Sequence, residues 1–129
     1  MSSIISPIVS ISVRPNIPVV AFSCENGKIY EWNFYEKHNK LTEIVSDFSS
    51  IFIEYSPDGN YLAVCSKGGT VNMYEVRDKK WLKSLTVSET DKAKPKVTYL
   101  TFSTDSKYFA TIDDSYAVSV FNYDYDPNG

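Results

Sequence analysis

The chain has 129 residues, a formal net charge of −3, 43% hydrophobic residues and 15% aromatic residues, with ten Tyr and seven Phe. This composition excludes collagenous and disordered chains, and the small negative charge argues against a basic nucleic-acid-binding face. No stretch approaches the roughly 20 apolar residues that cross a bilayer. Enrichment in aromatic and β-branched side chains favours a soluble all-β domain.

The chain matches itself three times without a gap. The aligned segments are Val13–Asn33, Tyr55–Glu75 and Phe102–Asn122. Two sets of residues fall in register, Ala21 with Ala63 and Ala110, and Trp32 with Tyr74 and Phe121. Repeats of about 40–50 residues indicate a solenoid or a propeller, in which one unit buries its faces only by stacking on its neighbours.

In the first repeat we expect four strands, at Ile8–Val13, Val19–Ser23, Lys28–Phe34 and near Leu41–Val45. Two interpretations of Ser3–Ser6 stay open: it is the outer strand of a preceding blade, or it pairs elsewhere. The second repeat predicts strands at Ile51–Tyr55, Tyr61–Cys65, Thr70–Val76 and Trp81–Leu85. Its turns contain Pro57, Gly59 and Gly68–Gly69, residue types that suit tight hairpins.

The third repeat predicts strands at Val97–Phe102, Tyr108–Ile112 and Ala117–Tyr123, and it lacks an outer fourth strand. Four antiparallel strands in about 40 residues make one blade of a β-propeller. We therefore expect residues 1–129 to form a partial propeller, with blades at approximately 8–45, 50–85 and 97–123. Propellers close with typically four to eight blades, so we expect the chain to be part of a larger propeller, completed by the same or another chain.

The middle repeat, YSPDGNYLAVCSKGGTVNMYE, resembles the WD-repeat β-propeller family, and the resemblance covers about residues 8–123. Two features depart from that family. The family's Trp-Asp pair appears as Trp32-Asn33, Tyr74-Glu75 and Phe121-Asn122, and the usual Gly-His pair is missing. The resemblance then implies that Trp32, Tyr74 and Phe121 stabilise the blades by aromatic packing between them.

Within that family, the stretch Asp113–Phe121 and the stretch Gly27–Asn33 are similar to the cilia- and flagella-associated WD-repeat proteins of the calmodulin- and spoke-associated complex. This resemblance implies a structural component of the ciliary axoneme, at the base of a radial spoke. It implies calmodulin- and spoke-associated axonemal subunits as partners.

Nothing in the sequence assembles a catalytic, cofactor or metal site. The chain has one histidine, His38, in a polar turn. Cys24 and Cys65 occupy positions that neighbouring repeats fill with serine, so we expect buried thiols rather than a disulfide. No Gly-Lys-Ser/Thr follows Gly68–Gly69 to make a phosphate loop. We therefore expect a protein that is not an enzyme.

The terminal segment Asp124–Gly129 fits the first six positions of a calcium loop. A calcium loop also needs an acid at its twelfth position and flanking helices, whereas a strand precedes this one. We favour the interpretation that it is a hairpin turn, and the start of a calcium loop stays the alternative.

Two places are candidates for partner binding. Lys92, Lys94 and Lys96 lie in a loop that makes the second and third repeats 47 residues apart, against 42 for the first and second. Trp81 lies on an expected outer strand. Loops on rigid scaffolds and exposed aromatic side chains carry recognition disproportionately. A plain surface loop and edge-strand packing are the simpler alternatives.

We therefore predict a non-catalytic scaffold for protein–protein interaction, located inside the cell, in the cytoplasm, the cytoskeleton or the ciliary axoneme. A general adaptor in another complex is the alternative. A small-ligand or enzymatic propeller is the rival from another class, although the inner strands offer Ser10, Ser12, Ser50, Glu54, Thr98 and Thr101 and no histidine.

Overall fold

The computed structural model describes residues 6–35, 41–45, 50–66, 68–77, 80–87 and 96–122, with residues 77 and 80–87 described by their backbone. All regular structure in these ranges is β-strand. His38, Lys92, Lys94 and Asp124–Gly129 lie outside the described residues, as do Ser3–Ile5. No helix in the described part of the chain is long and apolar enough to span a membrane.

Within the described residues, eleven strands form three antiparallel sheets in chain order. The first sheet contains β1 (Ile8–Val13), β2 (Val19–Cys24), β3 (Ile29–Asn33) and β4 (Leu41–Val45). The second contains β5 (Ser50–Tyr55), β6 (Tyr61–Ser66), β7 (Val71–Arg77) and β8 (Lys80–Val87). The third contains β9 (Val97–Phe102), β10 (Tyr108–Asp113) and β11 (Val118–Asn122). We call them blades 1, 2 and 3.

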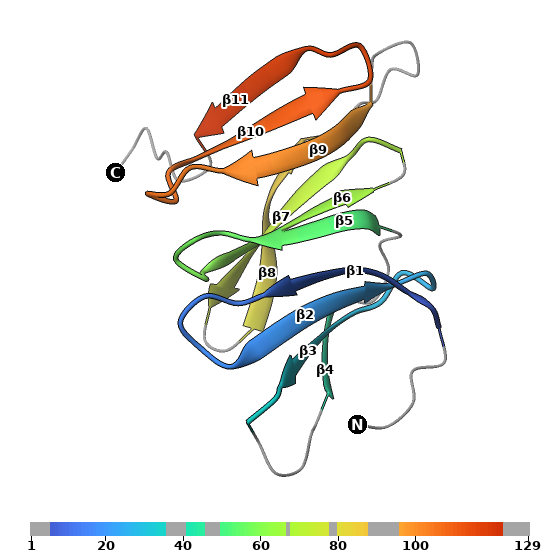
Figure 1. The fold of residues 1–129 in the computed structure, drawn as a ribbon, viewed down its shortest axis with the longest axis vertical. Coiled ribbons are helices and arrows are strands. Elements are labelled where there is room, and N and C mark those ends of the chain that lie inside the picture. Colours follow the sequence, from blue (N-terminus) through green and yellow to red (C-terminus); the bar gives the residue numbers. More distant parts are fainter. Residues whose placement is uncertain are drawn as a thin grey trace.

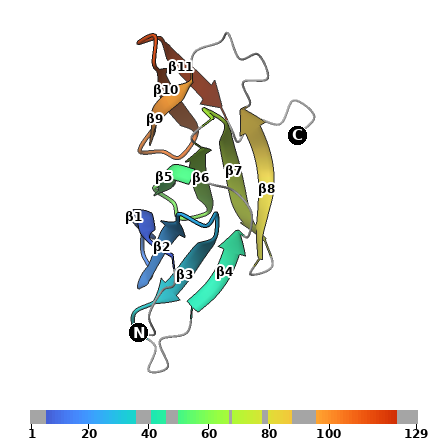
Figure 2. The same cartoon turned by 90° about the vertical axis from the view of Figure 1, so that its right-hand side faces the viewer.

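The three blades stack along the long axis of the molecule (Figure 1). Figure 2 shows the first strands of the blades, β1, β5 and β9, along one side, and the outer strands β4 and β8 on the other. In each blade the chain moves outward strand by strand and then returns to start the next blade. This arrangement is part of an all-β propeller, in which sheets are repeated around an axis.

The hairpin turns that join the first two strands of blades 2 and 3 are built alike. The Ser56 hydroxyl donates to Asp58 Oδ1 at 2.6 Å and accepts the Tyr61 N–H at 3.1 Å. Ser103 makes the same two bonds, to Asp105 at 2.6 Å and from Tyr108 at 3.1 Å. A small hydroxyl residue at the start of each turn therefore closes it against the start of the following strand.

Three strands, β1, β4 and β9, have the predicted ends, and the others differ by one or two residues. We expected the third strand of blade 1 to cover Lys28–Phe34, but β3 is shorter at both ends. Lys28 donates its N–H to Asn26 Oδ1 at 3.0 Å, and Phe34 donates its N–H to the Pro18 carbonyl at 3.0 Å. Both residues thus belong to turns.

Two hydrophobic clusters fill the spaces between the blades. One combines residues of blades 1 and 2: Ala21, Ile29, Val45, Ile53, Tyr55, Leu62, Val64 and Tyr74. The other combines residues of blades 2 and 3: Ala63, Cys65, Val71, Met73, Val97, Leu100 and Phe109. Each blade is therefore too thin to have a core of its own, and its apolar side chains are buried by the next sheet.

The turns between the second and third strands share one left-handed position. It is occupied by Gly27 with φ 91°, Gly69 with φ 87° and, in blade 3, Tyr116 with φ 68°. At Gly69 a Cβ atom would also lie 2.8 Å from the Lys96 Cα, at the start of the next blade. Gly69 is therefore required both by its backbone conformation and by the close approach of blade 3.

We expect Gly69→Ala to destabilise the propeller by roughly 1–3 kcal/mol, because the new Cβ meets both the left-handed backbone and the backbone at Lys96. Gly68→Ala is the matched control, since its Cβ would meet only the Ser66 hydroxyl, at 3.7 Å. Urea unfolding of the intact propeller measures both. Equal effects at the two glycines would contradict the close approach of blade 3.

Candidate interaction surface

Lys96 is the first described residue after the long loop between blades 2 and 3, and its backbone is fixed on both sides. Its N–H donates to Asp114 Oδ1 at 3.1 Å, and its carbonyl accepts the Asp114 N–H at 3.0 Å. The Lys96 side chain is exposed. The loop that carries Lys92 and Lys94 therefore ends at an anchored position with a lysine that faces solvent.

Blade 1 repeats one of these two bonds and adds a different one. The Glu25 N–H donates to the Pro7 carbonyl at 2.9 Å, and the Asn26 N–H donates to the Ser6 hydroxyl at 3.0 Å. Glu25 and Asp114 occupy the same repeat position, as do Pro7 and Lys96. In blades 1 and 3 the segment that enters the blade is thus tied to a turn of that blade.

Trp81, the other predicted anchor, lies on the outer strand β8, where its backbone pairs with Val76. Its side chain lies outside the described part of the structure. Trp81 and the loop lysines are therefore not joined into one patch by any described contact, and their roles in binding stay predictions.

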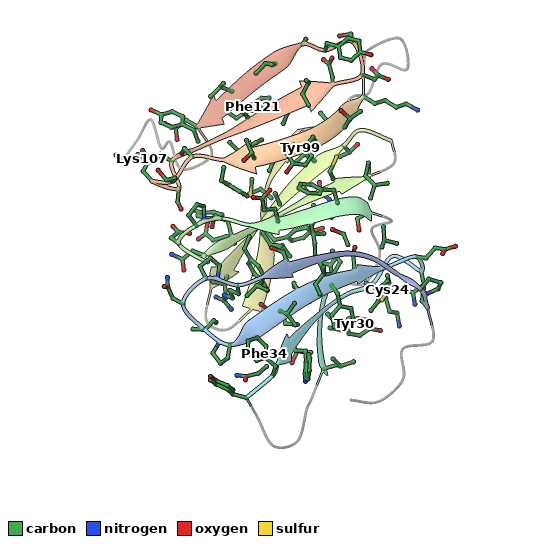
Figure 3. The ribbon with its side chains drawn as sticks, viewed as in Figure 1. Cys24, Tyr30, Phe34, Tyr99, Lys107 and Phe121 are labelled. Carbon is green, nitrogen blue, oxygen red and sulfur yellow. The ribbon has the colours of Figure 1, made fainter. Side chains whose placement is uncertain are left out.

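The three aromatic residues of the Trp-Asp position differ in their surroundings. Tyr74 is 9% exposed and belongs to the cluster shared with blade 1. Phe121 stacks on Phe109 at 5.0 Å between ring centroids and packs against the cluster shared with blade 2 (Figure 3). Trp32 is half-buried, and its Nε1 atom has no hydrogen-bond partner among the described residues. Tyr74 and Phe121 thus each face the preceding blade.

A cluster of polar side chains that the sequence analysis did not find joins blades 1 and 2. The Tyr55 hydroxyl donates to Glu31 Oε2, and Arg14 lies 3.5 Å from the same oxygen. The Arg14 guanidinium also sits over the Tyr55 ring, 5.9 Å from its centroid, and its Nε donates to the Gly59 carbonyl at 3.0 Å. One cation therefore contacts a carboxylate, an aromatic ring and a turn of the next blade.

The surroundings of Tyr55 keep its phenol protonated. Burial, and then the negative charge of Glu31, raise the pKa of Tyr55 far above its ordinary value, so the phenol remains a donor at neutral pH. A comparison of the three repeats could have revealed this cluster from the sequence. Glu31 is the only charged residue at a position filled by Met73 and Val120.

The inner strands of blades 1 and 2 are joined by side-chain hydroxyls. Ser10 accepts the Ile53 N–H at 3.1 Å, and Ser12 accepts the Tyr55 N–H at 3.1 Å. We had considered these serines among the polar groups that a central channel could offer a ligand. In the structure their oxygens are engaged between blades instead.

The two cysteines are buried thiols on β2 and β6. Burial raises the pKa of the Cys65 thiol to about 11 and also raises the pKa of Cys24. A protonated, buried thiol is a poor nucleophile and a poor metal ligand. Among the residues that the structure describes, no group of three or more His, Cys, Asp and Glu side chains could hold a metal ion.

These features define a class of protein. The family model "WD domain, G-beta repeat" matches residues 35–75, which run through β4 and then through the first strands of blade 2. A solved structure, the Cps50 (Swd1) beta-propeller domain of Myceliophteria thermophila, superposes with a TM-score of 0.74 at 11% identity, covering 89% of this chain and 38% of that one. The chain belongs to the WD-repeat family of β-propellers.

Two curated relatives share more of their sequence with this chain. The chain is 47% identical over 131 aligned residues to Cilia- and flagella-associated protein 251 of Tetrahymena thermophila, covering 97% of this chain and 13% of that protein. It is 29% identical over 115 aligned residues to the protein of the same name from Pongo abelii, covering 88% of this chain and 10% of that protein. The chain thus spans about an eighth or less of the length of these relatives.

We expect Tyr55→Phe to destabilise the propeller by about 1.5–3 kcal/mol, because it removes a hydrogen bond to a carboxylate. Because the folded-state pKa of Tyr55 is raised, this contribution is complete below about pH 10 and is lost at higher pH, where the unfolded phenol ionises. Urea unfolding of the intact propeller at pH 7 and pH 11 tests both parts.

Tyr116→Phe is the control for this prediction. Tyr116 is 85% exposed, so losing its hydroxyl is expected to change the free energy of unfolding by under about 0.5 kcal/mol. If Tyr55→Phe changed the free energy of unfolding no more than this control does, the bond to Glu31 would not stabilise the contact between the blades.

Proposed function

We propose that this chain is part of a ciliary WD-repeat protein that acts as a non-catalytic scaffold for other proteins of the axoneme. The observation that carries the proposal is the 47% identity to Cilia- and flagella-associated protein 251 across 97% of the chain. The similarity extends over all three blades, with the turns and loops included in the aligned range. The proposal extends to a place at the base of a radial spoke, with calmodulin- and spoke-associated subunits as partners.

The geometry supports a scaffold rather than an enzyme. Three polar side chains help to fix blades 1 and 2 together: Ser10 and Ser12 accept backbone N–H groups, and Glu31 accepts the Tyr55 hydroxyl. Turns such as those at Asn26 and Lys107 are exposed on these sheets. Such surfaces are suited to recognition of protein partners.

A localisation experiment separates this proposal from a general adaptor. The full-length protein, tagged and expressed at its natural level in a ciliated cell, is expected to be enriched in cilia and to remain with the axoneme after detergent extraction. Uniform distribution in the cytoplasm with no axonemal fraction would favour the general adaptor. Extraction with the membrane would contradict both.

The candidate surface is tested by replacing Lys92, Lys94 and Lys96 together with Ala in the full-length protein. We expect a loss of one or more co-purifying axonemal proteins with an unchanged fold, because the backbone contacts of Lys96 do not need its side chain. Quantitative mass spectrometry of the purified complex and circular dichroism measure the two effects.

Lys107 supplies the control. It is an exposed lysine in the turn that follows β9, whereas Lys96 precedes β9, so the two lie at opposite ends of the strand (Figure 3). Lys96→Ala and Lys107→Ala remove the same charge at opposite edges of blade 3. If the two single variants lost the same co-purifying proteins, or if the triple variant lost none, the loop would not be a binding site for partners.

A further inference from the structure

Tyr116 occupies a position that the other two blades fill with glycine. Its φ is 68°, in the left-handed region, as it is at Gly27 and Gly69. An aromatic residue in this region strains the backbone, whereas glycine does not. The turn would form more easily with glycine, so folding does not explain the tyrosine. Strained residues concentrate at functional sites, where the side chain itself is needed.

The turn that carries Tyr116 is fixed by hydrogen bonds. Asp113 Oδ1 accepts three of them, from the Ser115 N–H at 2.9 Å, the Ser115 hydroxyl at 2.6 Å and the Ala117 N–H at 3.1 Å. The Tyr116 N–H donates to the Asp113 carbonyl at 3.0 Å. The bond from the Ser115 hydroxyl lowers the pKa of Asp113, so these contacts are complete at neutral pH. A side chain held on a fixed turn loses less conformational entropy when it binds.

Tyr116 is 85% exposed, and a following blade would not cover it in the way that blade 3 covers Gly69. At Gly69 a Cβ atom would lie 2.8 Å from the Lys96 Cα and 3.1 Å from the Val97 nitrogen. Tyr116 has this Cβ and a phenol ring beyond it. A segment that entered the next blade as closely would therefore clash with Tyr116, so any such segment must run farther from the turn and leave the ring accessible.

Lys96 lies beside this turn. Its backbone is bonded to Asp114, two residues before Tyr116. Its side chain is exposed, and its ammonium group forms no ion pair within the described part of the chain. The carboxylates of Asp113 and Asp114, in contrast, accept backbone N–H groups. The charged group at this turn that lacks a partner is therefore a cation.

We propose that Tyr116 and Lys96 bind an acidic segment of another protein. A carboxylate of that segment pairs with the Lys96 ammonium, and an apolar side chain beside it packs on the Tyr116 ring. Tyrosine is among the residues that contribute most to protein interfaces, because it buries a large area at a small cost in conformational entropy. The inference rests on the scaffold function proposed above and gives the chemistry of one partner.

Charge favours a protein partner over a nucleic acid. A nucleic acid presents a continuous row of phosphates, and its binding needs a clustered basic face. Lys96 lies next to two carboxylates, those of Asp113 and Asp114, and the chain has a net charge of −3. One carboxylate of a peptide can pair with Lys96 alone, whereas a row of phosphates would also meet the two carboxylates.

Photo-crosslinking in the full-length protein identifies the bound segment. Tyr116 is replaced by the photoreactive residue p-benzoylphenylalanine in a ciliated cell, and crosslinked peptides are identified by mass spectrometry. We expect a segment of another protein with more acidic than basic residues. Tyr35 replaced in the same way is the matched control: it is 82% exposed and follows β3, whereas Tyr116 precedes the equivalent strand β11. The acidic segment is expected from Tyr116 and not from Tyr35.

Binding of the captured segment, made as a fluorescent peptide, then measures both side chains by anisotropy with the full-length protein. Tyr116→Gly is expected to weaken binding by at least about tenfold. It is expected not to lower the melting temperature, because glycine suits the left-handed backbone. Lys96→Ala is expected to weaken binding and to reduce its dependence on salt. Tyr35→Gly is expected to leave the dissociation constant unchanged.

Several results would overturn the proposal. These are crosslinks from Tyr116 only within the chain, to nucleic acid or to a segment without an acidic excess, and unchanged binding in either Tyr116→Gly or Lys96→Ala. A lower melting temperature of Tyr116→Gly would assign the ring a structural role and would also contradict it. If these variants kept every partner while the triple lysine variant lost some, the scaffold function would stand and this inference alone would fail.

Discussion

Burial between sheets is the constraint on which the rest of this structure depends. A four-stranded blade is one layer thick, so its side chains leave water only when another blade covers them. Leu62 and Phe109 are 0% and 1% exposed because neighbouring sheets meet there, while Val118 at the free face is 69% exposed. The hydrogen bonds within each sheet define the blade, but the free energy of burial comes from pairs of blades.

The two interfaces between blades exclude water with different chemical groups. Between blades 1 and 2, hydroxyls and one charged group supplement the apolar cluster, as in the contacts of Arg14 with Glu31 and Tyr55. Between blades 2 and 3 an aromatic contact, Phe52 with Tyr99 at 4.9 Å between ring centroids, and a bond from the Asp58 N–H to the Ser106 hydroxyl supplement the apolar cluster. A family position that usually holds a Trp-Asp pair can thus vary, because the interface as a whole rather than one residue excludes water.

Much of the fold could be predicted from the sequence because a propeller blade is specified locally. Alternating apolar residues and turn residues such as Pro57 and Gly59 give the strands and hairpins. The contacts across blades could not be predicted from one repeat, since Ser12 and Tyr55 are 43 residues apart and meet only through stacking. Within blade 3, the contact between Lys96 and Asp114 joins residues 18 apart, so it could not be predicted from a single strand or turn either. The candidate lysines were selected by loop length, which predicts exposure but carries no information about a partner.

The spacing of the contacts across blades has a consequence for how the chain acquires its structure. The bonds from Ile53 and Tyr55 to the serines of β1 each span 43 residues, and the bond from Asp58 to Ser106 spans 48. Hairpins form from neighbouring residues, so each blade can be assembled soon after it leaves the ribosome, whereas each interface must wait for the next blade. Because synthesis starts at the N-terminus, each blade emerges when the preceding blade is already available to pack against it.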